Sequence, residues 1–183
     1  MNQKDRFEEF SLFSTLREDY SANRGDLKAQ LVLTTFRLAH LLRMSSRAPR
    51  LLAYGATAIH RFCAEVVLGI EIRPRTKIGP GLTIFHGYGT VIHDASRIGS
   101  NVVLRHNVTI GQAIPGGPCP IVEDNVVFGV GATVLGGVRI GAGAMIGAHA
   151  LVTSDVPAGG VARAPRSRIY PSRNSSHEGP GFE

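Results

Sequence analysis

The sequence predicts a mainly β fold: a parallel β-solenoid of about five coils, preceded by an α-helical segment. Two observations carry this prediction. Apolar residues recur every six positions between Ile72 and Val152, a period that fits neither a helix nor an alternating strand. Glycine also changes in frequency, because only three of the 22 glycines lie in the first 71 residues and 19 lie in the last 112. The boundary between the two parts is therefore expected near residue 70.

The first part of the chain has the pattern of helices over residues 14–68. Residues 26–43 place leucines at helical spacing, namely Leu27, Leu31, Leu38 and Leu42. A second helical run over residues 50–68 opens after Pro49. Its apolar positions are Leu51, Leu52, Ala58, Phe62 and Val66. His40 and His60 lie inside these runs, where we expect structural roles.

The second part is built from hexads, each starting on an apolar residue. The starts are Ile72, Ile78, Ile84, Ile92, Ile98, Leu104, Ile110, Val122, Phe128, Val134, Ile140, Ile146 and Val152. Three hexads close one triangular coil of about 18 residues, as in solenoids of stacked short strands. We expect one inward apolar side chain per hexad, with small or polar residues at the corners, where glycine permits positive φ.

Two interruptions of the repeat are the places where function is expected, because solenoid loops carry functional residues. Two residues are inserted between Ile84 and Ile92, and residues 112–121 do not follow the hexad pattern. His86 lies in the first interruption, and His106 follows after one coil plus the two inserted residues. The two imidazoles should therefore lie near one edge, on coils about 4.8 Å apart. Histidine is the natural general base near neutral pH.

Glu71 begins the solenoid about one coil before His86, so its carboxylate is a candidate to orient the imidazole. The alternative is a surface acid beside Arg73 and Arg75. Metal binding is the less favoured role for the histidines, because three imidazoles would have to converge. His93 is displaced on its coil and His149 comes three coils later, so no metal site is predicted.

Composition excludes several classes of protein. Hydrophobic residues make up 43% of the chain and charged residues 19%, which excludes a disordered polyelectrolyte. The net charge is +6, but both parts mix basic and acidic residues, so no nucleic-acid partner is expected. No apolar run reaches the roughly 18 residues of an integral membrane segment. The charged start MNQKDRFEEF is unlike a secretory signal, and two cysteines make no disulfide framework, so we expect a cytoplasmic protein.

The hexads, the helical segment and the stretch EIRPRTKIGPGLTIFHGYGTVI resemble the serine acetyltransferase family over roughly residues 14–170. The segments IFHGYGTVI and LRHNVTIG and the Cys119–Pro120 pair are still more similar to a shorter branch, the colanic-acid (exopolysaccharide) biosynthesis acetyltransferases. The resemblance implies a left-handed parallel β-helix, acetyl-CoA as co-substrate and a homotrimer, with a dimer of trimers as the larger alternative.

The resemblance also implies a catalytic pair. His86 matches the family's catalytic base, and Glu71 matches the aspartate that pairs with it. His86 would take the proton of an acceptor hydroxyl as its oxygen attacks the thioester carbonyl, and backbone N–H groups would stabilise the oxyanion. This direct transfer needs no covalent enzyme intermediate, so Cys119 is interpreted as a pocket wall rather than a nucleophile.

Departures from the family pattern concern the acceptor. Serine-specific members carry an aspartate where this chain has Phe85, and an Arg-His pair where it has Pro118 and Cys119. A free amino acid needs a cation for its carboxylate, so we expect a sugar hydroxyl as acceptor, with serine as the alternative and another alcohol or amine after it. The expected acceptor residues are Asp19, Phe85, Tyr88, His106 and Cys119. A non-catalytic structural solenoid is the alternative of a different class, and it would not need the interruption at His86.

The donor site is expected on the later coils. Small positions that resemble the family's path for the pantetheine arm are Gly111, Gly129, Val130, Gly147 and Ala148. Arginines that could hold the phosphates of CoA are Arg163, Arg166 and Arg168. The expected organisation is a helical segment over 1–70, a β-helix over 71–170 and a disordered tail over 171–183.

Overall fold

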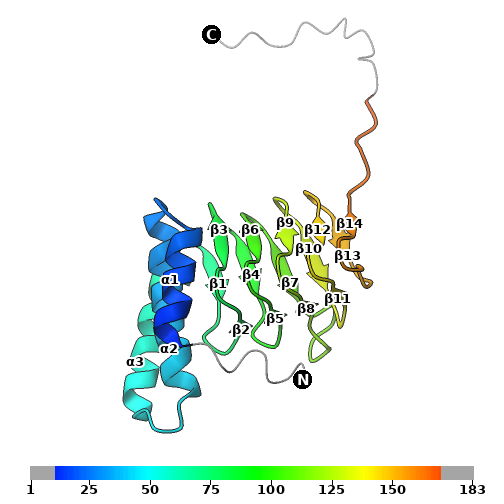
Figure 1. Ribbon diagram of the computed structural model, residues 1–183. Coiled ribbons are helices and arrows are strands. Elements are labelled where there is room, and N and C mark those ends of the chain that lie inside the picture. The colour runs from blue at the N-terminus through cyan, green and yellow to red at the C-terminus, as the bar shows by residue number, and fades with distance from the viewer. Residues whose placement is uncertain (1–10, 170–183) are drawn as a thin grey trace, which may run out of the picture.

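The computed structural model describes residues 11–169, so the tail expected at 171–183 lies outside the described residues. Three helices stand side by side against one end of a prism of stacked strands (Figure 1). The helices are α1 (Leu12–Ala22), α2 (Leu27–Met44) and α3 (Arg50–Arg61), and α3 runs directly into the π-helical turn η1 (Phe62–Val67). In the described range no helix is both long and apolar enough to cross a membrane.

Local sequence explains where the two longer helices begin. The side chain of Asp26 accepts hydrogen bonds from the backbone N–H groups of Lys28 and Ala29, both at 3.0 Å. These two donors have no partner within the helix, so the cap fixes the start of α2. Pro49 precedes the first residue of α3, where its fixed φ is compatible with a helix start.

The strands form three parallel sheets, because each coil adds a strand to each sheet in turn. Sheet A consists of β1 (Ile70–Ile72), β4 (Thr90–Ile92), β7 (Thr109–Gly111), β10 (Thr133–Leu135) and β13 (Leu151–Val152). Sheet B consists of β2 (Lys77–Ile78), β5 (Arg97–Ile98), β8 (Ile121–Val122) and β11 (Arg139–Ile140). Sheet C consists of β3 (Thr83–Phe85), β6 (Val103–Arg105), β9 (Val127–Phe128), β12 (Met145–Ile146) and β14 (Val161–Ala162). The fold is thus a left-handed parallel β-helix with N-terminal helices, which confirms the predicted fold class.

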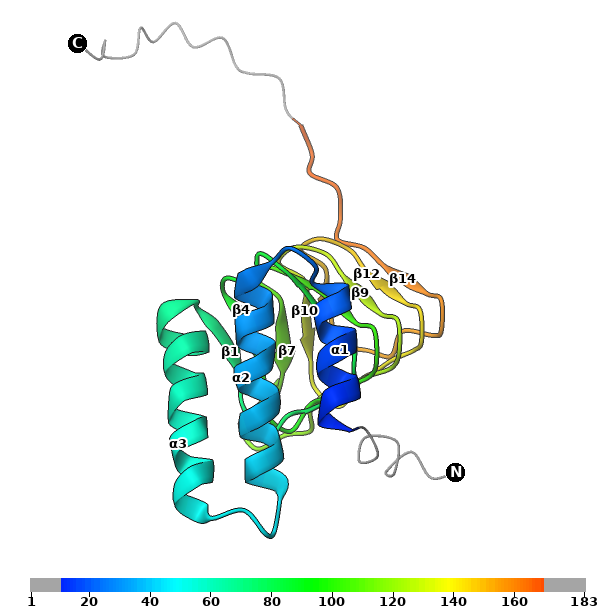
Figure 2. The same cartoon turned by 60° about the vertical axis from the view of Figure 1, so that its left-hand side comes forward.

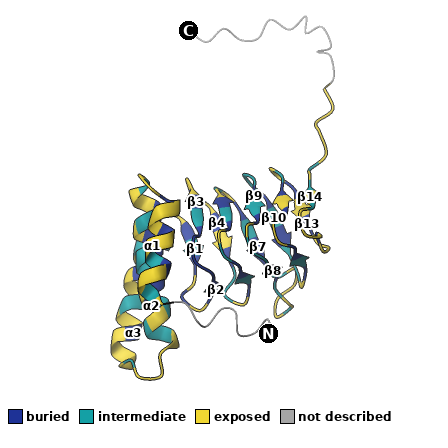
Figure 3. Ribbon diagram, viewed as in Figure 1, coloured by how far each residue is buried: buried dark blue, intermediate teal, exposed yellow. Residues whose placement is uncertain are grey.

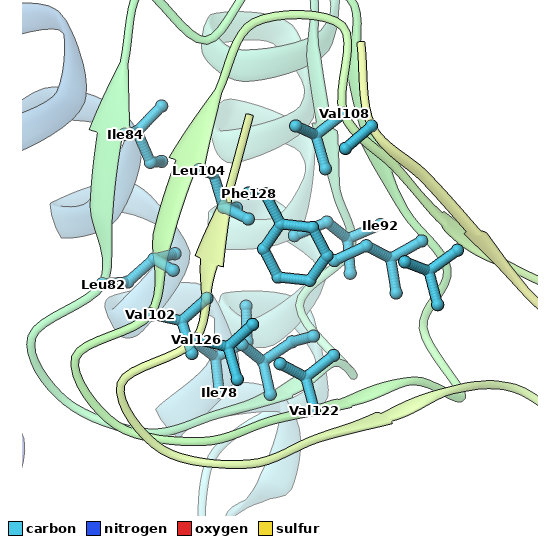
Figure 4. Close-up of a cluster of buried hydrophobic side chains, with 14 of the residues drawn as sticks. Ile78, Leu82, Ile84, Ile92, Val102, Leu104, Val108, Val122, Val126 and Phe128 are labelled. Atoms are coloured by element: carbon cyan, nitrogen blue, oxygen red, sulfur yellow. The ribbon is translucent and has the colours of Figure 1, made fainter. Parts of the chain in front are cut away.

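The interior of the prism confirms the hexad register and corrects its packing. All thirteen hexad starts are buried. A second inward position lies two residues before each start, as with Leu82 before Ile84 and Val126 before Phe128 (Figure 4). Side chains alternate between the two faces of a strand, so positions two apart must point the same way. The prediction of one inward side chain per hexad was therefore wrong, and each hexad supplies two.

The helices bury a different face from the one that the leucine spacing marked. The buried residues of α2 include Val32, Leu33 and Phe36, whereas Leu27 and Leu38 are exposed. Burial is thus concentrated on the side of the helices that faces the first coil (Figure 3). The apolar spacing read from the sequence is real, but it lies on the solvent side.

Polar side chains of the helices close the open end of the solenoid. The carboxylate of Asp19, fully buried, accepts from the backbone N–H groups of Gly81 and Leu82 at 2.9 and 3.1 Å. Arg37 donates to Asp19 at 2.9 Å and to the carbonyl of Ile78 at 2.6 Å. The first coil has no coil before it to pair with, so its backbone groups would otherwise be buried without partners.

Two histidines complete this closure. Nε2 of His60 lies 2.7 Å from the carbonyl of Ile72, and Nδ1 of His40 lies 2.7 Å from the carbonyl of Pro74. Burial lowers the pKa of both histidines below 6.5. The structural roles expected for His40 and His60 agree with these contacts.

Candidate functional site

The two residues that interrupt the hexads form a bulge between β3 and β4. His86 and Gly87 have φ of 63° and 41°, in the left-handed region. The backbone N–H of Asn107 donates to the carbonyl of Tyr88, and the N–H of Gly131 donates to the carbonyl of His106. Tyr88 and His106 therefore occupy equivalent corner positions, and His86 belongs to the inserted bulge. A non-glycine residue with positive φ is uncommon and is often found at functional sites.

The bulge brings His86 against His106, as the spacing predicts. The two imidazole rings are in an edge-to-face arrangement with centroids 6.3 Å apart. Nδ1 of His106 is buried and has no hydrogen-bond partner among residues 11–169. His86 itself is exposed at the prism edge, so its ring can be reached from outside.

A cavity of about 460 Å³ lies beside His86, between the start of α2 and the corner that joins the first coil to the second. Its walls include Asp26 and Lys28 from the helix and Tyr88 from the corner. The ammonium group of Lys28 lies 5.6 Å from the centroid of the Tyr88 ring. No carboxylate in the part of the chain that the structure describes is ion-paired with Lys28. The cavity thus combines an unpaired cation with the candidate base.

Lys28 and Asp26 are not among the residues that the sequence predicts for the site. They lie in the helical segment, nearly sixty residues before His86, and no hexad spacing connects them. Aspartate is a residue type that caps helices, but this preference says nothing about what the helix start faces. The first turn of α2 meets the corner at Tyr88 only because the helix packs against the solenoid, and a local sequence pattern does not report that packing.

Phe85 lies next to this cavity, on the outer face of sheet C. It is exposed, and the guanidinium of Arg105 lies 5.7 Å from the centroid of its ring. Phe85 and Arg105 are paired in register between β3 and β6. Tyr88, a wall of the cavity, is exposed as well.

Asp19 is a correction to the expected acceptor site. Its carboxylate is fully buried and bound by Arg37 and by two backbone N–H groups of the first coil. It lines neither the cavity beside His86 nor the one beside Glu71. We therefore assign Asp19 to the closure of the solenoid and not to acceptor binding.

Glu71 lies on the outer face of β1 and not in contact with His86. Its carboxylate pairs with Arg73 at 3.1 Å, and neither a hydrogen bond nor an ion pair joins it to His86 in the described chain. It lines a separate cavity of about 450 Å³ with Arg73, His93 and Gly111. The contacts match the alternative that the sequence left open, a surface acid beside Arg73.

Cys119 lies at the edge where the strands of sheet A end, away from the bulge at His86. Its Sγ is 3.2 Å from Nδ1 of His93, a ring nitrogen that also accepts from the N–H of Ala95. The thiol therefore donates to His93. Burial raises the pKa of Cys119 above its usual value, which works against a thiolate nucleophile.

The residues expected to bind the donor divide between the two edges. Gly129, Val130, Gly147 and Ala148 continue the edge of His106, because the N–H of Gly131 donates to the His106 carbonyl and that of His149 to Val130. Arg163 follows on this edge, since a Cβ on Gly147 would lie 3.5 Å from its Cα. Gly111 lies instead in the cavity of Glu71. Arg166 and Arg168 are exposed beyond β14.

Gly129 has a structural reason to be glycine. A Cβ at this position would lie 2.5 Å from the backbone nitrogen of Ala148 on the next coil. Close stacking of coils therefore requires glycine at 129, whether or not a ligand passes there.

Between residues 11 and 169, no group of three or more His, Cys, Asp or Glu is arranged to hold a metal ion.

Comparisons with known proteins agree with this architecture. Residues 119–154 match the family described as bacterial transferase hexapeptide (six repeats). The serine acetyltransferase of Helicobacter pylori (strain ATCC 700392 / 26695) is 38% identical over 161 residues, covering 84% of this chain and 90% of that protein. The chain belongs to the serine acetyltransferase family. It is accordingly an acyltransferase that uses acetyl-CoA.

Solved structures of serine acetyltransferases share its fold. Soybean serine acetyltransferase complexed with serine has a TM-score of 0.73 and 34% identity, covering 84% of this chain and 69% of that one. The Neisseria gonorrhoeae serine acetyltransferase in complex with serine has a TM-score of 0.70 and 28% identity, covering 84% and 68%. These relatives favour serine, the alternative acceptor, over the sugar and the polysaccharide branch that the sequence favoured.

Proposed function

We propose that this protein is a serine O-acetyltransferase, in which His86 is the general base and the cavity beside it holds the acceptor. The relatives reported above support serine. The observation that carries the site is the bulge that presents an exposed imidazole next to that cavity. Transfer is direct: His86 takes the hydroxyl proton, the oxygen attacks the thioester carbonyl, and CoA leaves as its thiol after receiving the proton.

The cavity also offers charges suited to a free amino acid. Lys28 lines it without an ion-pair partner among residues 11–169 and suits the carboxylate of serine. One carboxylate oxygen of Asp26 caps α2, and the other suits the ammonium group. Serine-specific members carry an Arg-His pair where this chain has Pro118 and Cys119. In this protein, Lys28 and Asp26 at the start of α2 would supply the cation and the anion for serine instead.

The donor is proposed to lie along the edge that continues from His106. Gly129, Val130, Gly147 and Ala148 form a run of small or short side chains there, and Arg163 stands at its far end. An extended pantetheine arm on this edge would bring its thioester towards His86 and its phosphates towards arginine. Arg166 and Arg168 are the further candidates for the phosphates.

Glu71 is retained as the partner of His86 on the resemblance alone, since the contacts place it on Arg73. The two roles differ in a measurable way. If Glu71 orients His86 during turnover, Glu71→Gln lowers kcat while Arg73→Ala does not. Equal, small effects of both substitutions would leave Glu71 as the surface partner of Arg73.

The test of the function is release of CoA from acetyl-CoA, followed with a thiol reagent against serine, sugars and sugar nucleotides. We expect serine to give the highest kcat/KM, and His86→Ala to lower kcat by about 10²–10⁴-fold with the fold intact. Preference for a sugar would instead favour the second candidate, which Phe85 and Cys119 support at positions where serine-specific members carry charged residues. Full activity of His86→Ala would exclude the mechanism.

A further inference from the structure

His106 is the histidine beside His86 at the edge of the prism, and the proposed function leaves it without a role. The two imidazole rings meet edge to face, with centroids 6.3 Å apart. His106 does not line the cavity of about 460 Å³ beside His86, although the sequence places it among the acceptor residues. His86 therefore adjoins both the acceptor cavity and a second imidazole that lies outside that cavity.

The two ring nitrogens of His106 differ in the hydrogen bonds that they can make. Nδ1 is buried and has no hydrogen-bond partner among residues 11–169. Nε2 is not enclosed in this way, and no described residue forms a hydrogen bond with it. A proton on Nδ1 would be a buried donor without an acceptor, which folded proteins tolerate less often than an unused acceptor. We therefore expect the neutral ring to carry its proton on Nε2, the nitrogen that a ligand can reach.

His106 also stands at the start of the edge proposed for acetyl-CoA. Its carbonyl accepts from the N–H of Gly131 on the next coil, and the carbonyl of Val130 accepts from the N–H of His149 on the coil after that. Figure 2 shows the coils one behind another, so equivalent corners line up along the prism. A thioester at the end of a pantetheine arm on this edge would reach His106 on its way to His86. The reacting carbonyl would therefore lie against both imidazoles.

Three backbone N–H groups at the corners of this edge are already occupied. Those of Asn107, Gly131 and His149 each donate to a carbonyl of the preceding coil. These bonds hold the stack of coils together, so the same N–H groups are not free to stabilise an oxyanion. The Nε2–H of His106 has no such partner in the described chain and is better placed to do so.

We propose that His106 is a second catalytic residue, whose Nε2–H donates a hydrogen bond to the thioester carbonyl oxygen and to the oxyanion formed from it. As the acceptor oxygen bonds to the carbonyl carbon, His86 takes the hydroxyl proton and the carbonyl π electrons move onto oxygen. Collapse of this intermediate re-forms the carbonyl and breaks the C–S bond, and the departing sulfur takes the proton from His86. His106 keeps its own proton throughout and stabilises the oxyanion electrostatically. The inference rests on the proposed function for the base and for the donor edge, and it holds for serine and for a sugar alike.

Two amide substitutions of His106 test which ring nitrogen matters. The amide nitrogen of glutamine takes the place of Nε2 of histidine, and that of asparagine takes the place of Nδ1. With acetyl-CoA and the preferred acceptor, His106→Asn and His106→Leu should lower kcat by about 10²–10³-fold and change the KM of either substrate little. His106→Gln should retain kcat within about tenfold, because it keeps a donor at the position of Nε2. Calorimetry with CoA, which has no acyl carbonyl, should give the same Kd for every variant and for the unmodified protein.

Circular dichroism and light scattering should show the fold and the oligomeric mass of the unmodified protein for each variant. Full activity of His106→Leu would overturn the proposal, and so would equal losses of kcat in His106→Gln and His106→Asn. Weaker binding of CoA, or a raised KM for the acceptor with kcat unchanged, would also overturn it by making His106 a binding residue. His86→Ala separates this inference from the proposed function. Loss of activity in His86→Ala beside full activity in His106→Leu removes only the role of His106, whereas full activity of His86→Ala removes the proposed mechanism itself.

Discussion

At the scale of single residues, the position of His86 depends on two residues that the hexads do not contain. His86 and Gly87 are the bulge that turns an ordinary corner into one with a protruding imidazole. Without the insertion, Tyr88 would follow Phe85 and the corner would repeat that of His106. The catalytic candidate therefore results from local backbone geometry at the corner between the first and the second coil.

The role of Lys28 leads to a prediction about the acceptor. Lys28→Ala should raise the KM for serine by about tenfold or more with little change in kcat, because a charge-assisted contact is lost. Serinamide has no carboxylate, so the same substitution should leave its KM unchanged. Steady-state kinetics with both acceptors check this. An equal rise for both would remove Lys28 from carboxylate binding without touching the assignment of serine as acceptor.

Cys119 gives a prediction about the chemical route. Because its thiol donates to His93 and its pKa is raised by burial, Cys119→Ser should retain kcat within about threefold of the unmodified enzyme. The serine hydroxyl can make the same hydrogen bond. Loss of activity together with an acetylated cysteine detected by mass spectrometry of the unmodified enzyme would show a covalent intermediate.

The buried histidines make stability depend on pH. His40 and His60 have pKa values lowered by burial, so the unfolded chain binds more protons than the folded one below pH 6.5. Their contribution is complete above pH 6.5 and is lost as the pH falls towards the folded values. Urea unfolding at pH 7.5 and 5.5 should show lower stability at the acidic pH, and His60→Gln should show a smaller difference between the two. An unchanged difference would assign the loss to other groups.

At the scale of elements, the helical segment is the end cap of the solenoid. Its side chains Asp19, Asn23 and Arg37 bind backbone groups of the first coil that in every later coil are bound by a neighbour. Spacing of leucines along the helices did not reveal this, because the cap is polar. The leucine spacing instead marks the solvent side of α2, where Leu27, Leu31 and Leu38 are exposed.

Substitution of Arg37 tests whether the helical end cap stabilises the protein. Arg37→Ala should lower the free energy of unfolding by about 3–5 kcal/mol, because it leaves the carboxylate of Asp19 buried without its ion-pair partner. The control is Arg61→Ala, which removes an exposed i,i+4 pair with Glu65 and should cost about 0.5 kcal/mol or less. Both are read by urea unfolding followed by circular dichroism. If the two substitutions lowered the free energy of unfolding by similar amounts, the contact of Arg37 with Asp19 would not be important for stability.

At the scale of the whole molecule, the site residues of one chain lie on two edges of the prism. His86 and the proposed donor positions share one edge, whereas Gly111 and Cys119 lie on the other. An assembly around a threefold axis would place one edge of a chain against the other edge of its neighbour. The implied trimer would therefore complete the site.

The mass of the protein in solution checks this arrangement. Light scattering should give three times the chain mass of 19.6 kDa, or a multiple of that trimer. Leu151, 67% exposed on the outer face of sheet A, is a candidate contact, and Leu151→Glu should lower both mass and activity. A monomer with full activity would show that one chain holds a complete site.

The β-helix, its register and the location of the catalytic candidate follow from the order of residues along the chain. Hexad periodicity is a property of consecutive residues, and it reports burial directly because each coil repeats the environment of the one before it. The interruption at His86 was visible for the same reason, as a break in that period.

The role of the helices, and the set of residues that share a cavity, depend on how distant segments of the chain pack together. Contacts of Asp19 with Gly81 and of Lys28 with the corner at Tyr88 join residues about sixty positions apart. No sequence period relates a helix to the coil against which it packs. The burial of Asp19, the position of Lys28 in a cavity and the exposure of the leucines therefore depend on how the helices pack on the first coil.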